Sequence, residues 1–433
     1  SIGENLAISN AKTDEMSGNP IIDVYRLTPT IPVYDASNPG GYGYGKQGVA
    51  DTFGTNPLAI ADFANATNEN FRIRGNIWSE VKFASWLKYR FNFGYETSID
   101  SYKFLRKVGN WSLNQPPDQS YIDQNKGRSQ TLLYENTLTF KKEFGKHDIT
   151  VLAGQTFQKD TYDQIYGTKR NLPINSATGQ YYTVLNQGDS SVVGGFINES
   201  ALTSYLGRLE YNYDNRYFLV GAFIRESSSR FGANKRAASF YTLGTSWILS
   251  QENFMENQKI FNLLKLRASY GLTGNAQIGD YQTLGLYSYS AQYNGNSGSF
   301  PSQMANDDLT WEKAETVNFG IDVGIFNRVS VNVDLYDKTT SELLLNVELP
   351  YTTGFASVIR NVGSVRNRGL EFNLSTINLN GEFKWETNFN IAHNRNRVTK
   401  LNGSDQFANA GNIQPVGLGQ DMDKWYMRIW AGV

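Results

Sequence analysis

Two neighbouring stretches decide the fold class: Val317-Asn-Phe-Gly-Ile-Asp-Val-Gly-Ile325 and, after a turn at Asn327-Arg328, Val329-Ser-Val-Asn-Val-Asp-Leu-Tyr336. Apolar residues alternate in both stretches with polar residues or glycine. Because successive side chains of a strand point to opposite faces of a sheet, this period of two predicts two strands with one apolar and one polar face. The short polar interruption between them predicts a hairpin turn.

The same alternation recurs along most of the chain. It predicts about twelve strands of about ten to thirteen residues each, long enough for a tilted strand to cross the hydrocarbon layer of a membrane. The predicted strands are 71–83, 89–96, 132–140, 149–157, 205–213, 216–226, 241–249, 264–272, 317–325, 329–336, 370–374 and 383–391. Their polar faces carry charges such as Arg72, Arg90 and Asp322, which a dry core would not tolerate but a water-filled lumen would. The only helix expected is a short piece at 250–258.

The connections between these strands alternate in length. Short turns are expected near 84–86, 144–147, 214–215, 327–328 and 379–381, and long loops over 97–128, 159–201, 227–236, 275–313 and 341–366. Short turns at one rim and long loops at the other are typical of an outer-membrane barrel. The predicted fold class is therefore all-β: an antiparallel transmembrane β-barrel with long extracellular loops and short periplasmic turns. We expect 1–70 to be an irregular segment leading into the barrel, 71–395 to hold the barrel strands, and 396–433 to be a loop toward further strands.

Aromatic residues are abundant, with 26 Tyr, 25 Phe and 8 Trp. Several lie near the ends of predicted strands, among them Trp86, Trp247, Trp311 and Trp385. Such positions suit the aromatic girdles that meet lipid headgroups at the two membrane interfaces. The alternative is that these rings pack the core of a soluble β-sandwich.

The composition excludes several classes of protein. Lys plus Arg number 40 and Asp plus Glu 41, so the chain has no excess of positive charge for binding nucleic acid. It contains no Cys and only two His, His147 and His393, which are not spaced as metal ligands. We therefore expect no metal site, no cofactor, no catalytic residue and no enzyme activity. The longest apolar run, 218–224, is too short for a transmembrane helix.

The predicted loop 97–128 offers the candidate binding residues. Trp111 and Tyr121 supply aromatic faces, and Asn114 supplies an amide among them. Apolar rings beside amide groups suit the binding of sugars or peptides, and binding residues concentrate on loops held by a rigid scaffold. The alternative is that these rings pack the loop itself or contact a lid.

Six segments, in order along 227–401, resemble the SusC/RagA-like TonB-dependent transporters of the outer membrane. They are Ser227-Ser-Ser-Arg-Phe-Gly232, Leu266-Arg-Ala-Ser-Tyr-Gly-Leu-Thr-Gly-Asn275, Leu309-Thr-Trp-Glu-Lys313, Asp334-Leu-Tyr-Asp-Lys-Thr-Thr340, Asn361-Val-Gly-Ser-Val-Arg-Asn-Arg-Gly-Leu-Glu371 and Asn388-Phe-Asn-Ile-Ala-His-Asn-Arg-Asn-Arg-Val-Thr-Lys-Leu401. Each motif alone is weak, but six in the family's order make a specific signal. The part before Ser227 matches more loosely.

The resemblance implies a location in the cell outer membrane, surrounded by its lipid, and a barrel of 22 strands closed by an N-terminal plug. It implies active import of large nutrients, oligosaccharides or oligopeptides, under a SusD-like lipoprotein lid and driven by the TonB complex. The chain shows no recognisable plug, TonB-contacting segment or terminal aromatic strand, so we expect a partial chain that reaches TonB through a region outside it. A passive porin and a secreted β-rich carbohydrate-binding or adhesin protein remain as alternatives.

Overall fold

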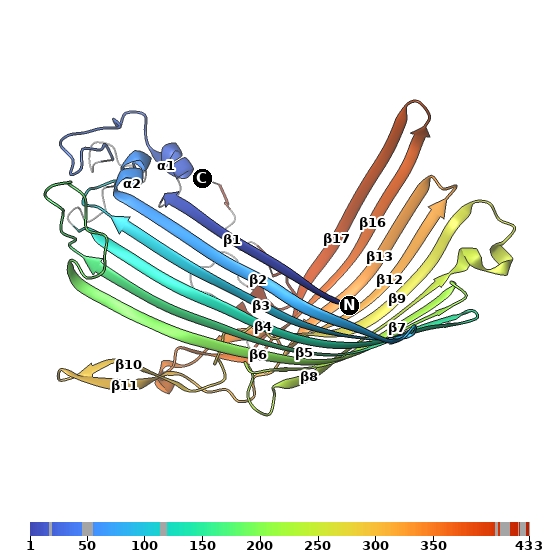
Figure 1. The fold of residues 1–433 in the computed structure, drawn as a ribbon. Coiled ribbons are helices and arrows are strands. Elements are labelled where there is room, and N and C mark those ends of the chain that lie inside the picture. Colours follow the sequence, from blue (N-terminus) through green and yellow to red (C-terminus); the bar gives the residue numbers. More distant parts are fainter. Residues whose placement is uncertain are drawn as a thin grey trace.

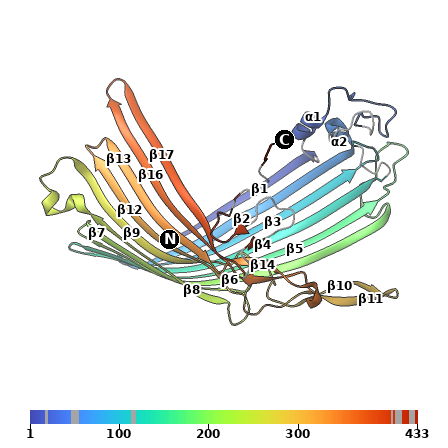
Figure 2. The same ribbon diagram turned by 180° about the vertical axis from the view of Figure 1, so that it is seen from behind.

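The computed structural model describes residues 1–16, 20–45, 55–112, 119–402, 406–407, 416–422, 424 and 430–432. Thirteen antiparallel strands form one sheet in chain order, β1-β2-β3-β4-β5-β6-β7-β8-β9-β12-β13-β16-β17 (Figure 1). They are β1 Ile2–Met16, β2 Ala64–Ala84, β3 Leu87–Arg106, β4 Tyr121–Phe144, β5 His147–Arg170, β6 Asp189–Tyr213, β7 Tyr217–Ser228, β8 Ala237–Ile248, β9 Phe261–Asn275, β12 Glu312–Ile325, β13 Val329–Ser341, β16 Ser364–Asn380 and β17 Lys384–Lys400. The sheet curls into an open trough, seen from its two sides in Figures 1 and 2.

The remaining elements lie in the connections. Three small hairpins are β10 Leu286–Tyr293 with β11 Asn296–Gln303, β14 Leu344–Glu348 with β15 Ser357–Asn361, and β18 Gln406–Phe407 with β19 Val416–Gly417. The helices are α1 Pro20–Arg26, α2 Pro57–Phe63 and the 3₁₀ turns η1 Leu249–Gln251, η2 Asn253–Met255 and η3 Tyr351–Thr353. Within the described ranges no helix has the length and apolar character needed to span a membrane.

The predicted hairpin at 317–336 is confirmed in register. Phe319 pairs with Leu335 on the apolar face and Asp322 pairs with Asn332 on the polar face. The turn occupies 326–328, where Phe326 and Asn327 have φ values of 51° and 54°. This left-handed backbone reverses the chain tightly and matches the twist of the two strands.

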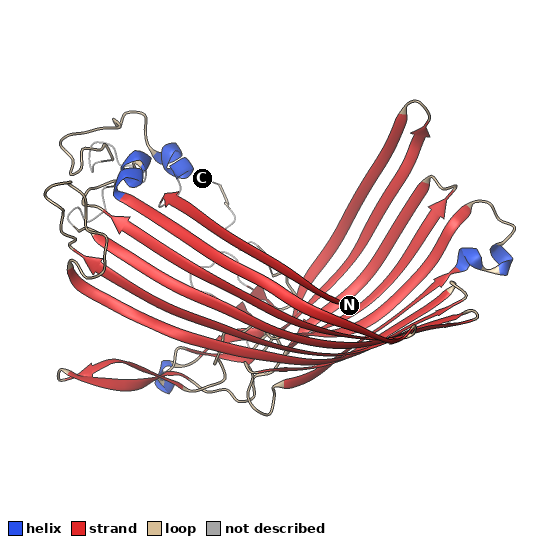
Figure 3. Cartoon of the chain, viewed as in Figure 1, coloured by secondary structure: helices blue, strands red, loops and turns tan. Residues whose placement is uncertain are grey.

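The two ends of the sheet differ as expected. Short turns join the strands at one end, the right in Figure 3, and the 249–260 segment with η1 and η2 is the longest connection there. Long connections lie at the other end, where α1, α2 and the β10–β11 hairpin are found. We call these ends the short-turn rim and the long-loop rim. The segment 281–290 also alternates, but the rhythm of short and long connections places it inside the predicted loop 275–313. The structure agrees: 286–290 belong to the β10–β11 hairpin within that connection, outside the main sheet.

Strand lengths depart from prediction in one half of the sheet. Strands β7, β8 and β13 have 12, 12 and 13 residues, close to the prediction, but β4, β5 and β6 have 24, 24 and 25. The loops predicted over 97–128 and 159–201 therefore shrink to 107–120 and 171–188. Beyond the apolar band these strands are mostly polar or do not alternate, as at Val192-Val193 and Phe196-Ile197 of β6, so the alternation ends while the backbone pairing continues.

The expected irregular segment 1–70 also differs from the structure. It contains β1, which pairs with β2 from Ile2 opposite Ser79 to Met16 opposite Asn65. Only a few apolar residues, such as Leu6 and Ile8, alternate in this polar strand, and its neighbour in the sheet lies about sixty residues away in sequence. Such distant pairing leaves no local signal. At the other end, β17 continues to Lys400, past the predicted boundary at 395.

Candidate functional site

One face of the sheet is apolar and exposed. Phe319 and Ile391, for example, are 59% and 56% exposed, and the large apolar side chains on neighbouring strands form one continuous surface with them. Members of this apolar face include Ile77, Val81, Leu138, Val151, Leu209, Leu219, Phe223, Leu243, Leu266, Phe319, Leu335, Leu370, Phe389 and Ile391. Exposed apolar surface on this scale marks contact with another apolar phase.

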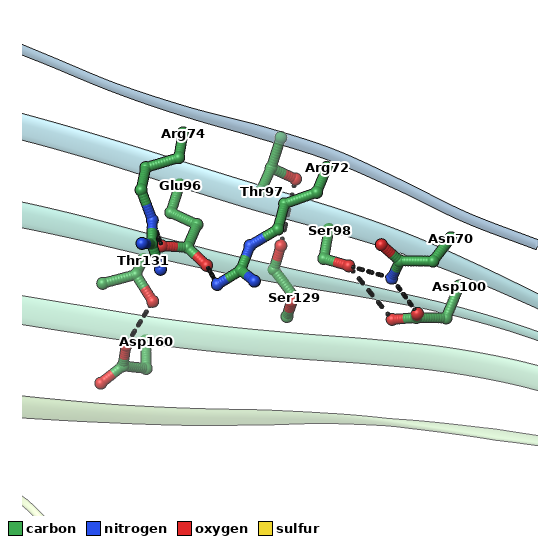
Figure 4. Close-up of polar contacts among 10 residues, drawn as sticks. All are labelled: Asn70, Arg72, Arg74, Glu96, Thr97, Ser98, Asp100, Ser129, Thr131 and Asp160. Atoms are coloured by element: carbon green, nitrogen blue, oxygen red, sulfur yellow. Dashed lines mark hydrogen bonds and ion pairs between the residues drawn. The ribbon is translucent and has the colours of Figure 1, made fainter. Parts of the chain in front are cut away.

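The opposite face is polar across the sheet, and its side chains bond one another between strands. Figure 4 shows the part over β2 to β5. Arg72 and Arg74 both pair with Glu96, with 2.6 Å between Arg74 Nε and Glu96 Oε2. Thr131 Oγ1 donates to Asp160 Oδ1 at 2.7 Å. Cross-strand pairing of this kind satisfies the charges of a wall that is not packed against a core.

A second group of charges lies on the polar face of β9, β12 and β13. The Arg267 guanidinium donates to Asp322 at 2.8 and 2.9 Å and to Asp334 at 2.9 and 3.0 Å. Asn332 Nδ2 also donates to Asp322, at 2.9 Å. Because one guanidinium joins carboxylates from two neighbouring strands, it fixes their relative position and leaves neither carboxylate unpaired.

A shallow groove of about 480 Å³ runs over the polar face from β5 to β12. Its lining includes Arg208, Glu210, Ser246, Arg267 and Asn318, all from the polar face. The groove offers donors and acceptors of both signs of charge. It can therefore contact a polar solute along its length without favouring strongly anionic or strongly cationic groups. No group of three or more His, Cys, Asp or Glu able to hold a metal ion occurs in the described part of the chain.

The predicted binding residues lie at the long-loop rim. Trp111 is only 9% exposed and packs with Ile60 and Phe63 of α2 and with Phe104 of β3. The Arg106 guanidinium lies 4.5 Å from the centre of the Trp111 ring, an arrangement that binds a cation to an aromatic face. The ring thus contributes to the core of this rim.

Tyr121, the first residue of β4, lies beside the same cluster. Its ring centre is 5.9 Å from the Arg106 guanidinium and 5.5 Å from the Phe104 ring, and the side chain is partly buried. The structure therefore brings Trp111 and Tyr121 together around one arginine. Asn114, the third predicted residue, lies outside the described residues. Substrate contact by these residues stays a prediction.

A polar contact helps to hold this cluster in place. The Tyr42 hydroxyl donates to Asp62 Oδ2 at 3.3 Å, and Lys107 Nζ lies 3.1 Å from Asp62 Oδ1. Burial, and then the nearby Asp62 carboxylate, raise the pKa of Tyr42 above its ordinary value, so the hydroxyl keeps its proton. The contact joins the segment before α2 to α2 itself and to the start of the loop after β3.

Trp311 differs from its predicted place in an aromatic girdle. It is 2% exposed and lies in a second cluster at the long-loop rim, with Phe231, Phe240 and Leu309. Its Nε1 donates to the Arg236 carbonyl at 2.9 Å. The prediction is wrong here because proximity to a strand end does not reveal whether a ring faces lipid or lies beneath a folded loop.

The residues of the groove were not singled out as a site from the sequence. Alternation places Arg208, Glu210 and Arg267 on the polar face but does not show their partners. Arg208 and Glu210 pair with each other along β6, whereas Arg267 of β9 pairs with Asp322 and Asp334 of strands β12 and β13. Only the register of those strands shows which charges meet. The sequence did contain a signal for this site, because strands with one apolar face carry an unusual number of charges on the other face.

Comparisons with known proteins agree with this architecture. Residues 23–432 match a family model described as TonB dependent receptor-like, beta-barrel. TonB-dependent receptor P39 of Formosa agariphila is 34% identical over 436 residues, which cover 94% of this chain and 41% of that protein. TonB-dependent receptor SusC of Bacteroides thetaiotaomicron is 28% identical over 440 residues, covering 91% of this chain and 42% of that protein.

Solved structures show the same fold. The RagAB peptide transporter superposes with a TM-score of 0.78 at 26% identity, covering 87% of this chain and 42% of that one. The chain thus spans about two fifths of the length of these proteins. These relatives are described as receptors and as a transporter and not as enzymes, in agreement with the prediction that the chain has no enzyme activity. With its alternating strands, unequal rims and a family match over nearly all of its length, the chain belongs to the TonB-dependent receptor β-barrel family of the outer membrane, among relatives of the SusC and RagA type.

Proposed function

We propose that this chain forms part of the barrel wall of a transporter that actively imports large nutrients, oligosaccharides or oligopeptides. The observation that carries the proposal is the continuous polar face, which would line the lumen while the apolar face meets lipid. The similarity to SusC and to a peptide transporter supports a large polar cargo.

Transport would be a property of a longer protein. In the described part of the sheet, β1 and β17 are the two edge strands. An unpaired strand edge in hydrocarbon costs several kcal/mol for each unsatisfied backbone group, so further strands must close the barrel. A plug and the segment that contacts TonB would come from regions outside this chain.

The polar face would act as a series of weak contacts for the cargo. Many of its cations and carboxylates pair with one another, as at Arg267 with Asp322 and Asp334, so a passing solute exchanges hydrogen bonds with charges that are already compensated. Tight binding at one point would slow release, whereas many exchangeable contacts allow both entry and exit. No covalent step is involved.

The long-loop rim would receive a SusD-like lipoprotein lid. Two packed clusters, around Trp111 and around Trp311, give this rim a fixed shape on which a second protein could rest. Tyr121, at the edge of the first cluster and partly exposed, is our candidate for contact with captured cargo.

The test is uptake of labelled oligosaccharides and oligopeptides by cells that carry or lack the gene encoding this chain. We expect uptake of one of these cargo classes to require the gene and to stop when an uncoupler removes the proton gradient. Gene-dependent uptake that persists with the uncoupler would instead indicate a passive porin. Recovery of the protein from the culture medium, with none in the outer membrane, would indicate a secreted binding protein.

A further inference from the structure

The apolar face ends abruptly on β13, β16 and β17. In the register of these strands, Leu335 pairs with Leu370, which pairs with His393. The next outward-facing row toward the long-loop rim is Asp337, Arg368 and Arg395, and the row after it is Thr339, Arg366 and Arg397. Four arginines therefore lie directly beyond the apolar surface. We call Arg366, Arg368, Arg395 and Arg397 the arginine patch.

The arginine patch has more positive charge than its neighbours compensate. Asp337 accepts from Arg366 at 2.8 and 2.5 Å and from Arg368 at 2.8 Å. Arg395 and Arg397 are exposed, and in the part of the chain that the structure describes neither makes an ion pair. Four guanidinium groups thus share one carboxylate. Like charges directly opposite each other destabilise a sheet, so this arrangement implies a compensating anion.

Three cations elsewhere on the same outward face are each paired with one carboxylate. Lys12 pairs with Glu69 at 3.2 Å, Arg128 with Asp163 at 2.6 Å and Lys159 with Glu199 at 3.0 Å. These pairs also lie on the long-loop side of the apolar face. Other outward-facing cations, such as Lys126 and Arg225, also make no ion pair in the described part of the chain. The feature particular to β16 and β17 is the cluster of four arginines with one carboxylate. Glu315, on β12, already accepts from the Tyr270 hydroxyl at 2.7 Å.

The height of the arginine patch matches the lipid headgroup layer. A strand rises about 3.3 Å per residue and barrel strands tilt by roughly 45°, so successive outward-facing rows are separated by about 5 Å along the membrane normal. Arginine side chains placed one and two rows beyond the apolar surface extend from the hydrocarbon boundary into the polar layer. Pairing of a further strand with β17 would use its backbone and leave these side chains facing the lipid.

We propose that the arginine patch binds the phosphate groups of an outer-leaflet lipid. Guanidinium groups form paired hydrogen bonds with phosphate oxygens, and two arginines in register on adjacent strands can hold one phosphate between them. The neighbouring apolar side chains of Leu370 and Ile391 would contact the acyl chains of the same lipid. The inference depends on the placement of the barrel in the outer membrane and not on which nutrient is carried.

The test uses the complete protein that contains this chain, purified in detergent, with lipid A as the phosphorylated probe. Bound lipid is counted by native mass spectrometry for lipid A and for the same lipid after removal of its phosphates. We expect the wild-type protein to prefer phosphorylated lipid A by about tenfold or more, the ratio that 1.4 kcal/mol provides. Equal binding of the two lipids would overturn the proposal without any substitution.

Substitutions locate the site. The double variant Arg395→Gln/Arg397→Gln should lose the preference, whereas the control Arg128→Gln, which removes a paired arginine from the same outward face, should keep it. The heat-dependent gel mobility of the folded barrel verifies that each variant is folded. A double variant that binds phosphorylated lipid A as well as wild type would place the site elsewhere. Full displacement of the lipid by millimolar inorganic phosphate would show a site for the free ion and would also contradict the proposal.

Discussion

The two rims of the sheet use aromatic residues in opposite ways. At the short-turn rim, Tyr213, Tyr217 and Trp247 form a row on the surface with ring centres 6.1 to 6.2 Å apart, and Trp385, on β17 at the same rim, is 54% exposed. At the long-loop rim, Trp111 and Trp311 are buried in clusters. Rings of the first kind suit a membrane interface, while those of the second kind give long loops a core of their own.

Aromatic residues near strand ends therefore serve two purposes: some meet the membrane interface and others form the cores of long loops. A short turn needs no core because its backbone bonds are completed by the hairpin. A long connection must bury apolar side chains to remain folded, since the entropy of ordering it has to be offset. Substitutions can therefore separate the two rims.

The largest expected effect is that of Trp311→Ala. Removing this fully buried ring leaves a cavity beside Phe231 and Phe240, whose ring centres lie 5.2 and 5.4 Å away. We expect local stability to fall by about 3–5 kcal/mol. Limited proteolysis should then cut the long loop 276–311 while the strands stay intact. The matched control is Trp385→Ala at the short-turn rim, which should leave proteolysis unchanged. Equal sensitivity of the two variants to proteolysis would contradict the proposed difference between the two rims.

A smaller effect is expected for Asn56→Ala. Asn56 Oδ1 accepts from the backbone N–H groups of Leu58 and Ala59, which caps α2, and Nδ2 donates to the carbonyls of Val33 and Gly43 at 2.9 Å. Loss of a buried cap of this kind should lower the stability of the cluster around Trp111 by about 2 kcal/mol.

The measurement for Asn56→Ala is hydrogen exchange of the backbone amides in α2. Exchange should accelerate there and stay unchanged in β12, which has no contact with α2. Retention of slow exchange in α2 would show that packing alone holds this rim together.

The smallest effect concerns pH at the short-turn rim. Hydrogen bonds from the Tyr217 hydroxyl at 2.6 Å and from Trp247 Nε1 at 2.9 Å lower the pKa of Glu252, in the connection after β8, below its usual 4.5. A lowered pKa means that the ionised group stabilises the folded state above pH 4.5, and that this contribution is lost as the pH falls through the lowered value. The temperature of thermal unfolding should therefore fall more between pH 5 and pH 3 for wild type than for Glu252→Gln. Parallel pH profiles for the two proteins would contradict this account.

The sequence predicted the sheet where one face had to be apolar. Alternation at 317–325 and 329–336 located the turn-side ends of β12 and β13 and the face on which each side chain lies, because a shift of one position would turn every apolar side chain to the wrong face. Each strand extends five residues further at its other end. The same signal failed for β1 and for the outer halves of β4, β5 and β6. Those segments are mostly polar, and their few apolar residues alternate only briefly, as Leu6 and Ile8 do, or stand in consecutive pairs such as Val192-Val193. Backbone pairing with a strand distant in sequence orders them.

The candidate site was less predictable for a related reason. Trp111 and Tyr121 do meet, but through Arg106, whose position depends on the unexpected extension of β3. The groove residues Arg208 and Arg267 lie on β6 and β9, and β7 and β8 lie between these two strands, so only the order and register of the sheet bring them to one groove. Patterning reveals the face on which a side chain lies, and pairing across strands decides which side chains meet.

The central claim is that the apolar face meets lipid and the polar face lines an aqueous lumen. The chain contains no Cys, so single substitutions Asn318→Cys through Val323→Cys on β12 allow a spin label to be placed at each position in turn. In reconstituted membranes, labels at 319, 321 and 323 should collide mainly with oxygen dissolved in the lipid, and labels at 318, 320 and 322 mainly with a water-soluble nickel complex. Accessibility that does not alternate, or that alternates with the opposite phase, would contradict the account.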